Sequence, residues 1–162
     1  MNIKLIKMNY VLMIAMILAD IFVKILIDNF LMGKKFFIIS DKLGFVPFLN
    51  TEQMSVYNNE LGLGLELSCL IVVNVISVLV VIGIRKSLKQ GNEWNALLDI
   101  GTVMILAGTF CSLIDKIFWK GSLDYLLIVD SIIDMKDIYM VIGLFVCVAD
   151  VCRQLITKYY SK

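Results

Sequence analysis

The chain has 162 residues, of which 60% are hydrophobic and 18% charged, with 15 basic and 14 acidic side chains. Soluble domains carry about a quarter charged residues and less than half apolar ones, so this composition excludes a water-soluble domain, a disordered chain, a disulfide scaffold and a nucleic-acid binder. The sequence contains no histidine, which excludes serine–histidine and cysteine–histidine catalysis and the common zinc ligand sets.

Four segments are long and apolar enough to cross a bilayer, which takes about 20 helical residues. Hydrocarbon offers no partner to an unpaired backbone group, so each of these segments must be a helix. We expect the spans at residues 8–32, 67–84, 95–118 and 138–156. The sequence therefore predicts an all-α membrane protein with four transmembrane helices, forming a single integral membrane domain over residues 1–162.

Two segments connect the spans on one side of the membrane. Residues 33–66 contain short β-prone runs, FFIIS and GFVPFLN, that are broken by Gly44 and Pro47. They predict a small β-like cradle at the membrane surface between the first and second helices. The other segment, residues 119–137, joins the third and fourth spans and is rich in aspartate.

The basic residues predict the orientation of the chain. Eight of them flank the spans on the side of the two termini: Lys4, Lys7, Arg85, Lys86, Lys89, Arg153, Lys158 and Lys162. The opposite side has six: Lys34, Lys35, Lys42, Lys116, Lys120 and Lys136. Cytoplasmic loops carry the excess of lysine and arginine, so both termini are expected in the cytoplasm.

Ionisable residues at membrane depth are costly and need a reason. Asp20 and Lys24 lie four residues apart in the first span, on one helix face, where they can pair. An ion pair that eases membrane insertion and a functional pair are both consistent with this spacing. Asp99 lies near the cytoplasmic end of the third span, where we expect it to reach water.

Asp115 closes the third span and Asp137 opens the fourth, so the two carboxylates are expected at the same membrane depth. Two carboxylates held close together in a low dielectric share a proton, and such a pair can activate water and protonate a leaving group. The alternative is that both are ordinary helix-end residues, with Asp137 favoured by the positive end of the helix dipole.

A series of short motifs follows along nearly the whole chain. In order they are Asp20-Ile21-Phe22-Val23-Lys24, Pro47-Phe48-Leu49-Asn50, Tyr57-Asn58-Asn59 with Gly64, Ala107-Gly108, Ile114-Asp115-Lys116, Asp124-Tyr125, and Asp137 with Ile142-Gly143. Their order and spacing resemble those of lipoprotein signal peptidase (signal peptidase II), a family of four-helix aspartic peptidases of the bacterial inner membrane.

The resemblance implies hydrolysis of a signal peptide just before a diacylglyceryl-modified cysteine, with Asp115 and Asp137 as the catalytic dyad. It implies that lipid-modified prolipoprotein signal peptides and membrane lipids are the partners, without a cofactor or metal. The residues expected to bind substrate or support the dyad are Asp20, Lys24, Asn58, Ser112, Lys116, Asp134 and Lys136.

This sequence departs from the family pattern around the expected site. Ser112 and Asp134 replace asparagines, Lys116 replaces an arginine, Lys136 an alanine and Glu60 a glycine. Asp134 would raise the pKa of a neighbouring carboxyl group, whereas Lys136 would offset that effect. The chain is therefore identified as a divergent member of the family.

Three other functions are consistent with parts of the sequence. One is a catalytically impaired relative that binds lipidated signal peptides or another lipid-anchored partner in the same groove. Another is a serine nucleophile with a lysine base, because Ser112 and Lys116 stand one helical turn apart. A transporter is disfavoured because the four spans show neither repeated halves nor helix-breaking prolines.

Overall fold

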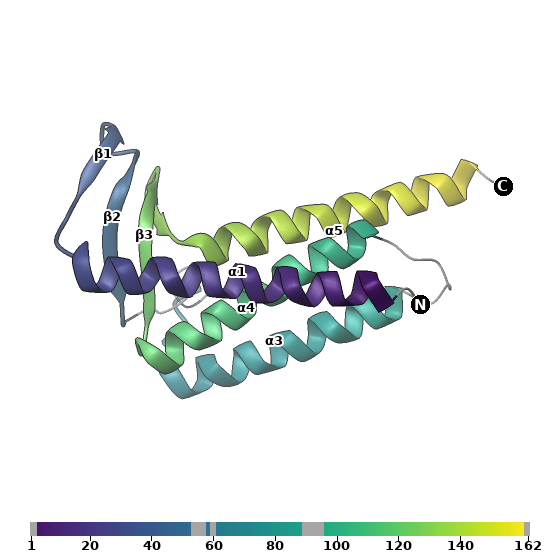
Figure 1. Cartoon of the computed structure of the whole chain (residues 1–162), viewed down its shortest axis with the longest axis horizontal. Helices are drawn as coiled ribbons and strands as arrows, with labels where there is room; N and C mark the ends of the chain where they lie inside the picture. Colours follow the sequence, from purple (N-terminus) through teal and green to yellow (C-terminus); the bar gives the residue numbers. More distant parts are fainter. Residues whose placement is uncertain (1–2, 53–57, 59–60, 89–95, 161–162) are drawn as a thin grey trace.

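A computed structural model describes residues 3–52, 58, 61–88 and 96–160, with no side chains described for residues 3–7 and 88. Three residues that the sequence analysis named lie outside the described residues: Tyr57, Asn59 and Glu60. Among the described residues, four helices are long and apolar enough to cross a membrane, as the sequence predicts (Figure 1). They are α1 (Ile3–Phe30), α3 (Leu67–Leu88), α4 (Ala96–Phe118) and α5 (Met135–Tyr160).

Helix α5 begins three residues earlier than the sequence predicts, and this places Lys136 and Asp137 in its first turn. The cause is a reciprocal cap. The backbone N–H of Asp137 donates to Oδ1 of Asp134 at 3.2 Å, and the backbone N–H of Asp134 donates to Oδ2 of Asp137, also at 3.2 Å. Such a box satisfies two N–H groups that the start of a helix leaves unpaired.

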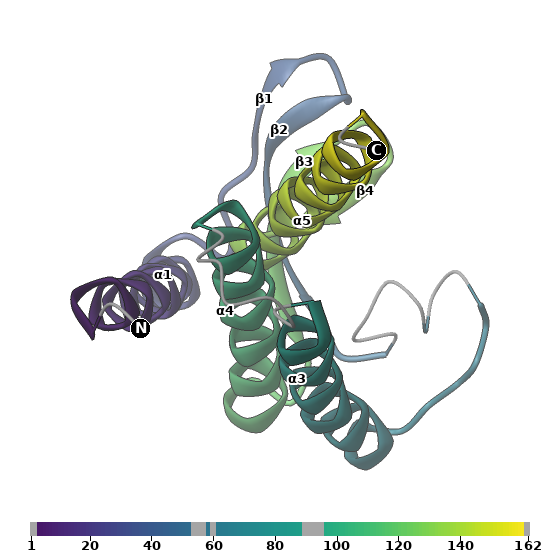
Figure 2. The ribbon, with the colours of Figure 1, turned by 90° about the vertical axis from the view of Figure 1, so that its right-hand side faces the viewer.

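Helix α4 is the central helix and packs against α1, α3 and α5 (Figure 2). In its most apolar stretch 61% of the residues are buried, against 17% or less in the other three helices. The other helices expose large apolar side chains to their surroundings, as expected of faces that contact lipid. Polar side chains on α4 are therefore shielded by the surrounding helices.

Glycines bring α4 and α5 into close contact. A Cβ added to Gly101 would lie 2.8 Å from the carbonyl oxygen of Gly143, and one added to Gly108 would lie 2.7 Å from that of Lys136. Small residues at such crossings let two membrane helices approach along their backbones. The contact at Gly108 fixes the first turn of α5 against α4.

A four-stranded antiparallel sheet lies at one end of the helices, and both termini lie at the other end (Figure 1). Its order is β1-β2-β3-β4, with strands Phe36–Ile39, Leu43–Asn50, Ser122–Ile128 and Ser131–Ile133. The prediction of a cradle between the first two helices covers only β1 and β2. Strands β3 and β4 come from the segment between α4 and α5. The aspartates of this segment interrupt its apolar pattern, so the sequence did not predict strands there.

Candidate functional site

Eight charged side chains form one network at the end of the helices that carries the sheet. They are Asp20 and Lys24 of α1, Asp115 and Lys116 of α4, Asp124 of β3, Asp134 just before α5, and Lys136 and Asp137 of α5. Seven are buried and Asp137 is half-buried. With five carboxylates and three ammonium groups, the network carries excess negative charge when every group is ionised.

The ammonium group of Lys24 joins α1 to α4. Its Nζ donates to both carboxylate oxygens of Asp115, at 2.8 and 2.7 Å. It also lies 3.0 Å from Oδ2 of Asp20 and 2.5 Å from Oδ2 of Asp134. The predicted pairing of Asp20 with Lys24 is confirmed. The sequence could not reveal the partner on α4, because Asp115 lies 91 residues away.

A second buried ammonium group, that of Lys136, joins α5 to α4 and β3. Its Nζ donates to Oδ2 of Asp134 at 2.5 Å, to Oγ of Ser122 at 2.8 Å and to Oδ1 of Asp124 at 3.3 Å. It also lies 3.1 Å from Oδ2 of Asp115. Two of the departures from the family pattern, Asp134 and Lys136, are therefore ion-paired with each other.

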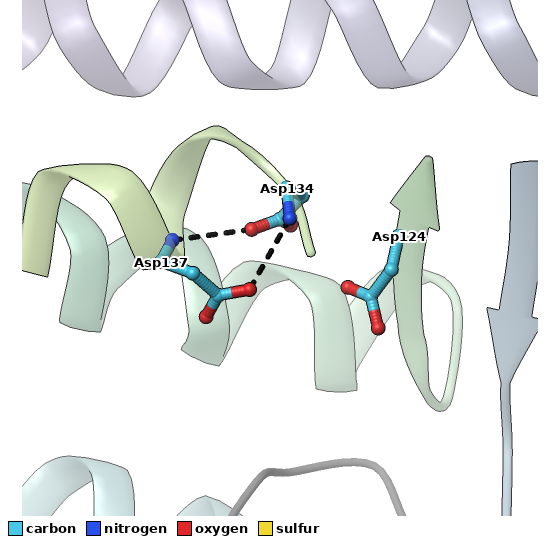
Figure 3. A group of neighbouring side chains, drawn as sticks. All are labelled: Asp124, Asp134 and Asp137. Carbon is cyan, nitrogen blue, oxygen red and sulfur yellow. Dashed lines mark hydrogen bonds between the residues drawn. The ribbon is translucent and has the colours of Figure 1, made fainter. Parts of the chain in front are cut away.

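Three carboxylates converge beside the start of α5. One oxygen from each of Asp124, Asp134 and Asp137 lies within 4.8 Å of the others. Figure 3 shows the carboxylate of Asp124, on β3, facing that of Asp137 across a short gap. Their spacing would suit a metal ion. The ammonium group of Lys136 already binds two of the three, so a lysine supplies the positive charge here and we assign no metal.

Asp124 was not among the site residues predicted from the sequence. The sequence predicts Asp115 near Asp137; in the structure Lys24 and Lys136 contact Asp115, and Asp124 adds a carboxylate near Asp137. The available signal was the Asp124-Tyr125 motif. The motif points to the site only when β3 is known, because β3 pairs with β2 and places Asp124 opposite Phe48.

The carboxyl groups of Asp124 and Asp134 respond differently to burial. Burial raises the pKa of Asp124 above its usual value, although the ammonium group of Lys136 and the hydroxyl of Ser122 oppose this shift. Burial would also raise the pKa of Asp134, but the ammonium groups of Lys136 and Lys24 lower it below its usual value. The two lysines therefore favour the ionised form of Asp134, whereas burial favours the protonated form of Asp124 more than in a free aspartate.

Three further predicted residues form local contacts. Nζ of Lys116 donates to Oγ of Ser112 at 2.9 Å, one turn earlier on α4. The side chain of Asn58 donates to the carbonyl of Leu65 at 3.2 Å and accepts from its N–H at 2.8 Å. Asn58 is thus bound to Leu65, two residues before α3 begins.

Comparison with known proteins gives a family and a fold. The family model described as signal peptidase (SPase) II matches residues 12–153. Two solved structures, each described as a bacterial membrane enzyme determined by the in meso method, share this fold. The first has a TM-score of 0.78 at 14% identity and covers 94% of this chain and 92% of its own. The second has a TM-score of 0.72 at 14% identity, with coverages of 90% and 93%. Among curated proteins, none matches the sequence.

Proposed function

This chain belongs to the signal peptidase II family, and from that premise we propose that it is a membrane aspartic endopeptidase. Its substrates are the signal peptides of prolipoproteins, which it cleaves before the diacylglyceryl-modified cysteine. Membership of the family indicates a peptidase, and the four apolar helices indicate a multi-pass membrane protein. The observation that carries the proposal further is the convergence of carboxylates beside the half-buried Asp137.

We assign Asp115 and Asp137 as the catalytic pair. Lys24 donates to both oxygens of Asp115, and Nζ of Lys136 lies 3.1 Å from Oδ2 of the same carboxylate, so two lysines hold it beside the first turn of α5. Asp124 is held by Lys136 in the same way and lies near Asp137 as a further carboxylate of the site.

The pair can hydrolyse a peptide bond without histidine or metal. The ionised carboxyl group takes a proton from a water molecule as the water oxygen attacks the scissile carbonyl carbon. The protonated carboxyl group donates its proton to the leaving amide nitrogen, and the C–N bond then breaks. The products are a carboxylic acid and an amine, and the pair again shares one proton.

The position of the network suits a substrate that stays in the membrane. The charges lie where the apolar helices meet the sheet, so a lipid chain can remain among the exposed apolar helix faces while the peptide reaches Asp137. Both termini lie at the opposite end, the side with more basic residues. We therefore place the termini in the cytoplasm and the site at the outer face of the bacterial cytoplasmic membrane.

Cleavage of a synthetic diacylglyceryl-modified signal peptide by the purified protein tests this function. We expect cleavage by the wild type and a loss of at least about 1,000-fold in Asp137→Asn and in Asp115→Asn, because each removes a proton-transfer group. Asp150→Asn, at the other end of α5, is the matched control and should retain cleavage.

Two outcomes would revise the proposal. Cleavage that survives in Asp115→Asn but disappears in Asp124→Asn would make Asp124 the partner of Asp137. Binding of the peptide without cleavage by the wild type would indicate the catalytically impaired relative.

A serine–lysine peptidase is the second candidate, because Nζ of Lys116 lies 2.9 Å from Oγ of Ser112. A lysine within hydrogen-bond distance can act as the base for a serine nucleophile. In the described geometry the buried Lys116 is the donor to Ser112. Activity that survives in Asp137→Asn and disappears in Ser112→Ala would favour this candidate over the aspartic pair.

A further inference from the structure

Strand β1 exposes every one of its side chains, although all four are large and apolar. The exposed fractions are 57% for Phe36, 51% for Phe37, 70% for Ile38 and 57% for Ile39. β1 is also an edge strand of the sheet. An apolar edge strand in water invites aggregation, so native proteins shorten, charge or cover such edges. This strand therefore needs a partner that covers it.

We propose that a phospholipid leaflet covers it: the hairpin of β1 and β2 docks on the membrane that the helices span, and lysines at its base bind anionic lipid headgroups. The apolar side chains of β1 enter the headgroup region of the leaflet nearest the site, while Lys34 and Lys35 contact phosphate groups. This inference goes beyond the proposed peptidase function and does not depend on it.

The first support is the direction of the hairpin. In Figure 1, β1 and β2 run across the helix axes at the end of the helices that carries the sheet. In Figure 2, which looks along the helices, the hairpin projects past α4 on the side between α1 and α5. The helices are long and apolar enough to cross the membrane. A hairpin that runs across their axes and projects past them therefore lies over lipid.

The second support is that the exposed apolar surface of α1 continues into the hairpin. Phe30, the last residue of α1, is 70% exposed, and β1 begins at Phe36. The ring of Phe36 stacks on that of Phe45 in β2, with centroids 5.1 Å apart, and Phe45 packs against the core cluster that includes Ile27 of α1. The core thus holds the hairpin beside a lipid-facing helix. Aromatic and aliphatic side chains on one face are typical of segments that lie in the membrane interface.

The third support is the positive charge at the base of the hairpin. Lys34 and Lys35 lie exposed between α1 and β1, and neither is ion-paired with a carboxylate among the described residues. At the tip, Lys42 has two acidic neighbours: Asp41 in the chain, and Asp130, which follows the residue whose N–H donates to the Lys42 carbonyl at 2.6 Å. The excess positive charge therefore lies at the base, where α1 leaves the membrane and lipid phosphates are within reach.

Quenching of tryptophan by brominated lipids tests the proposal in the whole protein. Ile38→Trp places an indole on β1, and the emission of the two native tryptophans is subtracted with the wild type. The protein is embedded in nanodiscs of equal parts phosphatidylcholine and phosphatidylglycerol, with bromine near the carbonyl end of the chains of one lipid or of the other. We expect brominated phosphatidylglycerol to quench the new indole at least about twofold more, because each lysine beside an anionic surface strengthens binding by about fivefold. Molar salt should remove this excess.

Matched variants separate the hairpin from the rest of the molecule. In the Ile38→Trp protein, Lys34→Gln/Lys35→Gln should abolish the preference for phosphatidylglycerol. Lys86→Gln/Lys120→Gln removes the same charge from exposed positions outside the hairpin and should leave the preference unchanged. Val72→Trp, at a 56% exposed position of α3, is the reference probe and should be quenched about equally by the two lipids.

A second readout needs no added tryptophan. Native mass spectrometry of the wild type, released from micelles that contain both lipids, counts the phospholipids that stay bound. We expect phosphatidylglycerol to be retained in preference to phosphatidylcholine, and Lys34→Gln/Lys35→Gln to lose most of this preference.

Three results would overturn the proposal. One is equal quenching of the new indole by the two brominated lipids, and another is a preference that survives in Lys34→Gln/Lys35→Gln. The third is an indole that neither lipid quenches, which would place the hairpin in water or against a second copy of the chain. Peptide cleavage enters none of these measurements, so failure of the peptidase function and failure of lipid docking are distinguishable.

Discussion

The two ends of the helix bundle bury charged side chains in different ways. At the end that carries the termini, each buried carboxylate has a basic partner that reaches the surface. Arg85, 30% exposed, binds Asp99 at 2.9 Å through Nε, and Arg153, 62% exposed, binds Asp150 at 2.7 Å. At the end that carries the sheet, Lys24 and Lys136 are almost fully buried and each contacts three carboxylates.

The difference shows which charges serve the fold and which can serve chemistry. Arginines that extend to water neutralise single carboxylates and let the helix ends cross the interface. In the network at the sheet, carboxylates outnumber ammonium groups, and carboxylates held close together in a low dielectric favour keeping a proton. The predictions below ask whether the two ends respond differently to equivalent changes, beginning with the largest expected effect.

Removal of Lys24 should have the largest effect on stability. Lys24→Met keeps the length of the side chain and leaves Asp20, Asp115 and Asp134 without this ammonium group. Loss of one partner of a buried ion pair costs about 3–5 kcal/mol. Denaturant unfolding in detergent micelles should show a loss of this size. A loss under about 1 kcal/mol would mean that the network does not hold α1 to α4.

A side chain at Gly108 should separate α5 from α4. Gly108→Val places carbon atoms where the Lys136 carbonyl oxygen lies, and overpacking of this kind costs about 1–3 kcal/mol. Cleavage should fall with stability, because Lys136 and Asp137 move together. Gly83→Ala on α3 is the control, since a Cβ there meets nothing within 4 Å. Equal stability of the two variants would contradict the close approach.

Acid should weaken the sheet end through Asp134. The pKa of Asp134 is lowered in the folded protein by Lys136 and Lys24 despite its burial, so its contribution to stability is complete above the unfolded value of about 3.9 and is lost as pH falls through the folded pKa. The thermal midpoint of the wild type should therefore fall below about pH 4. In Asp134→Asn this fall should be shallower, and an identical fall would contradict the assignment.

The smallest effect is expected at the other end of α5. Arg153→Gln removes a pair whose arginine is 62% exposed, and pairs of this kind contribute about 0–1 kcal/mol. The unfolding midpoint should move little and cleavage should stay at the wild-type level. A destabilisation as large as that of Lys24→Met would remove the contrast between the two ends.

The sequence predicted what depends on local pattern. Apolar length was sufficient to place four helices, and a spacing of four residues was sufficient to pair Asp20 with Lys24. The sequence could not predict contacts between residues that lie far apart along the chain. Lys24 meets Asp115 only because α1 packs against α4, and Asp124 enters the site only because β3 joins the sheet.

The prediction that Asp99 contacts water is wrong. The place of Asp99 near a helix end predicted contact with water, but its side chain is fully buried and Arg85 of α3 reaches it instead. Asn74 makes another contact that its position alone does not reveal: its side chain donates to the carbonyl of Leu70 in its own helix. In both cases the partner depends on how a side chain is oriented, which composition and spacing do not determine.

The most direct test of the account is the cleavage of one diacylglyceryl-modified signal peptide by four purified proteins: wild type, Asp137→Asn, Asp115→Asn and Asp150→Asn. The account predicts a single cut before the lipidated cysteine in the wild type and in Asp150→Asn, and no detectable cut in the other two when all four are folded. A cut of wild-type rate in folded Asp137→Asn would contradict it.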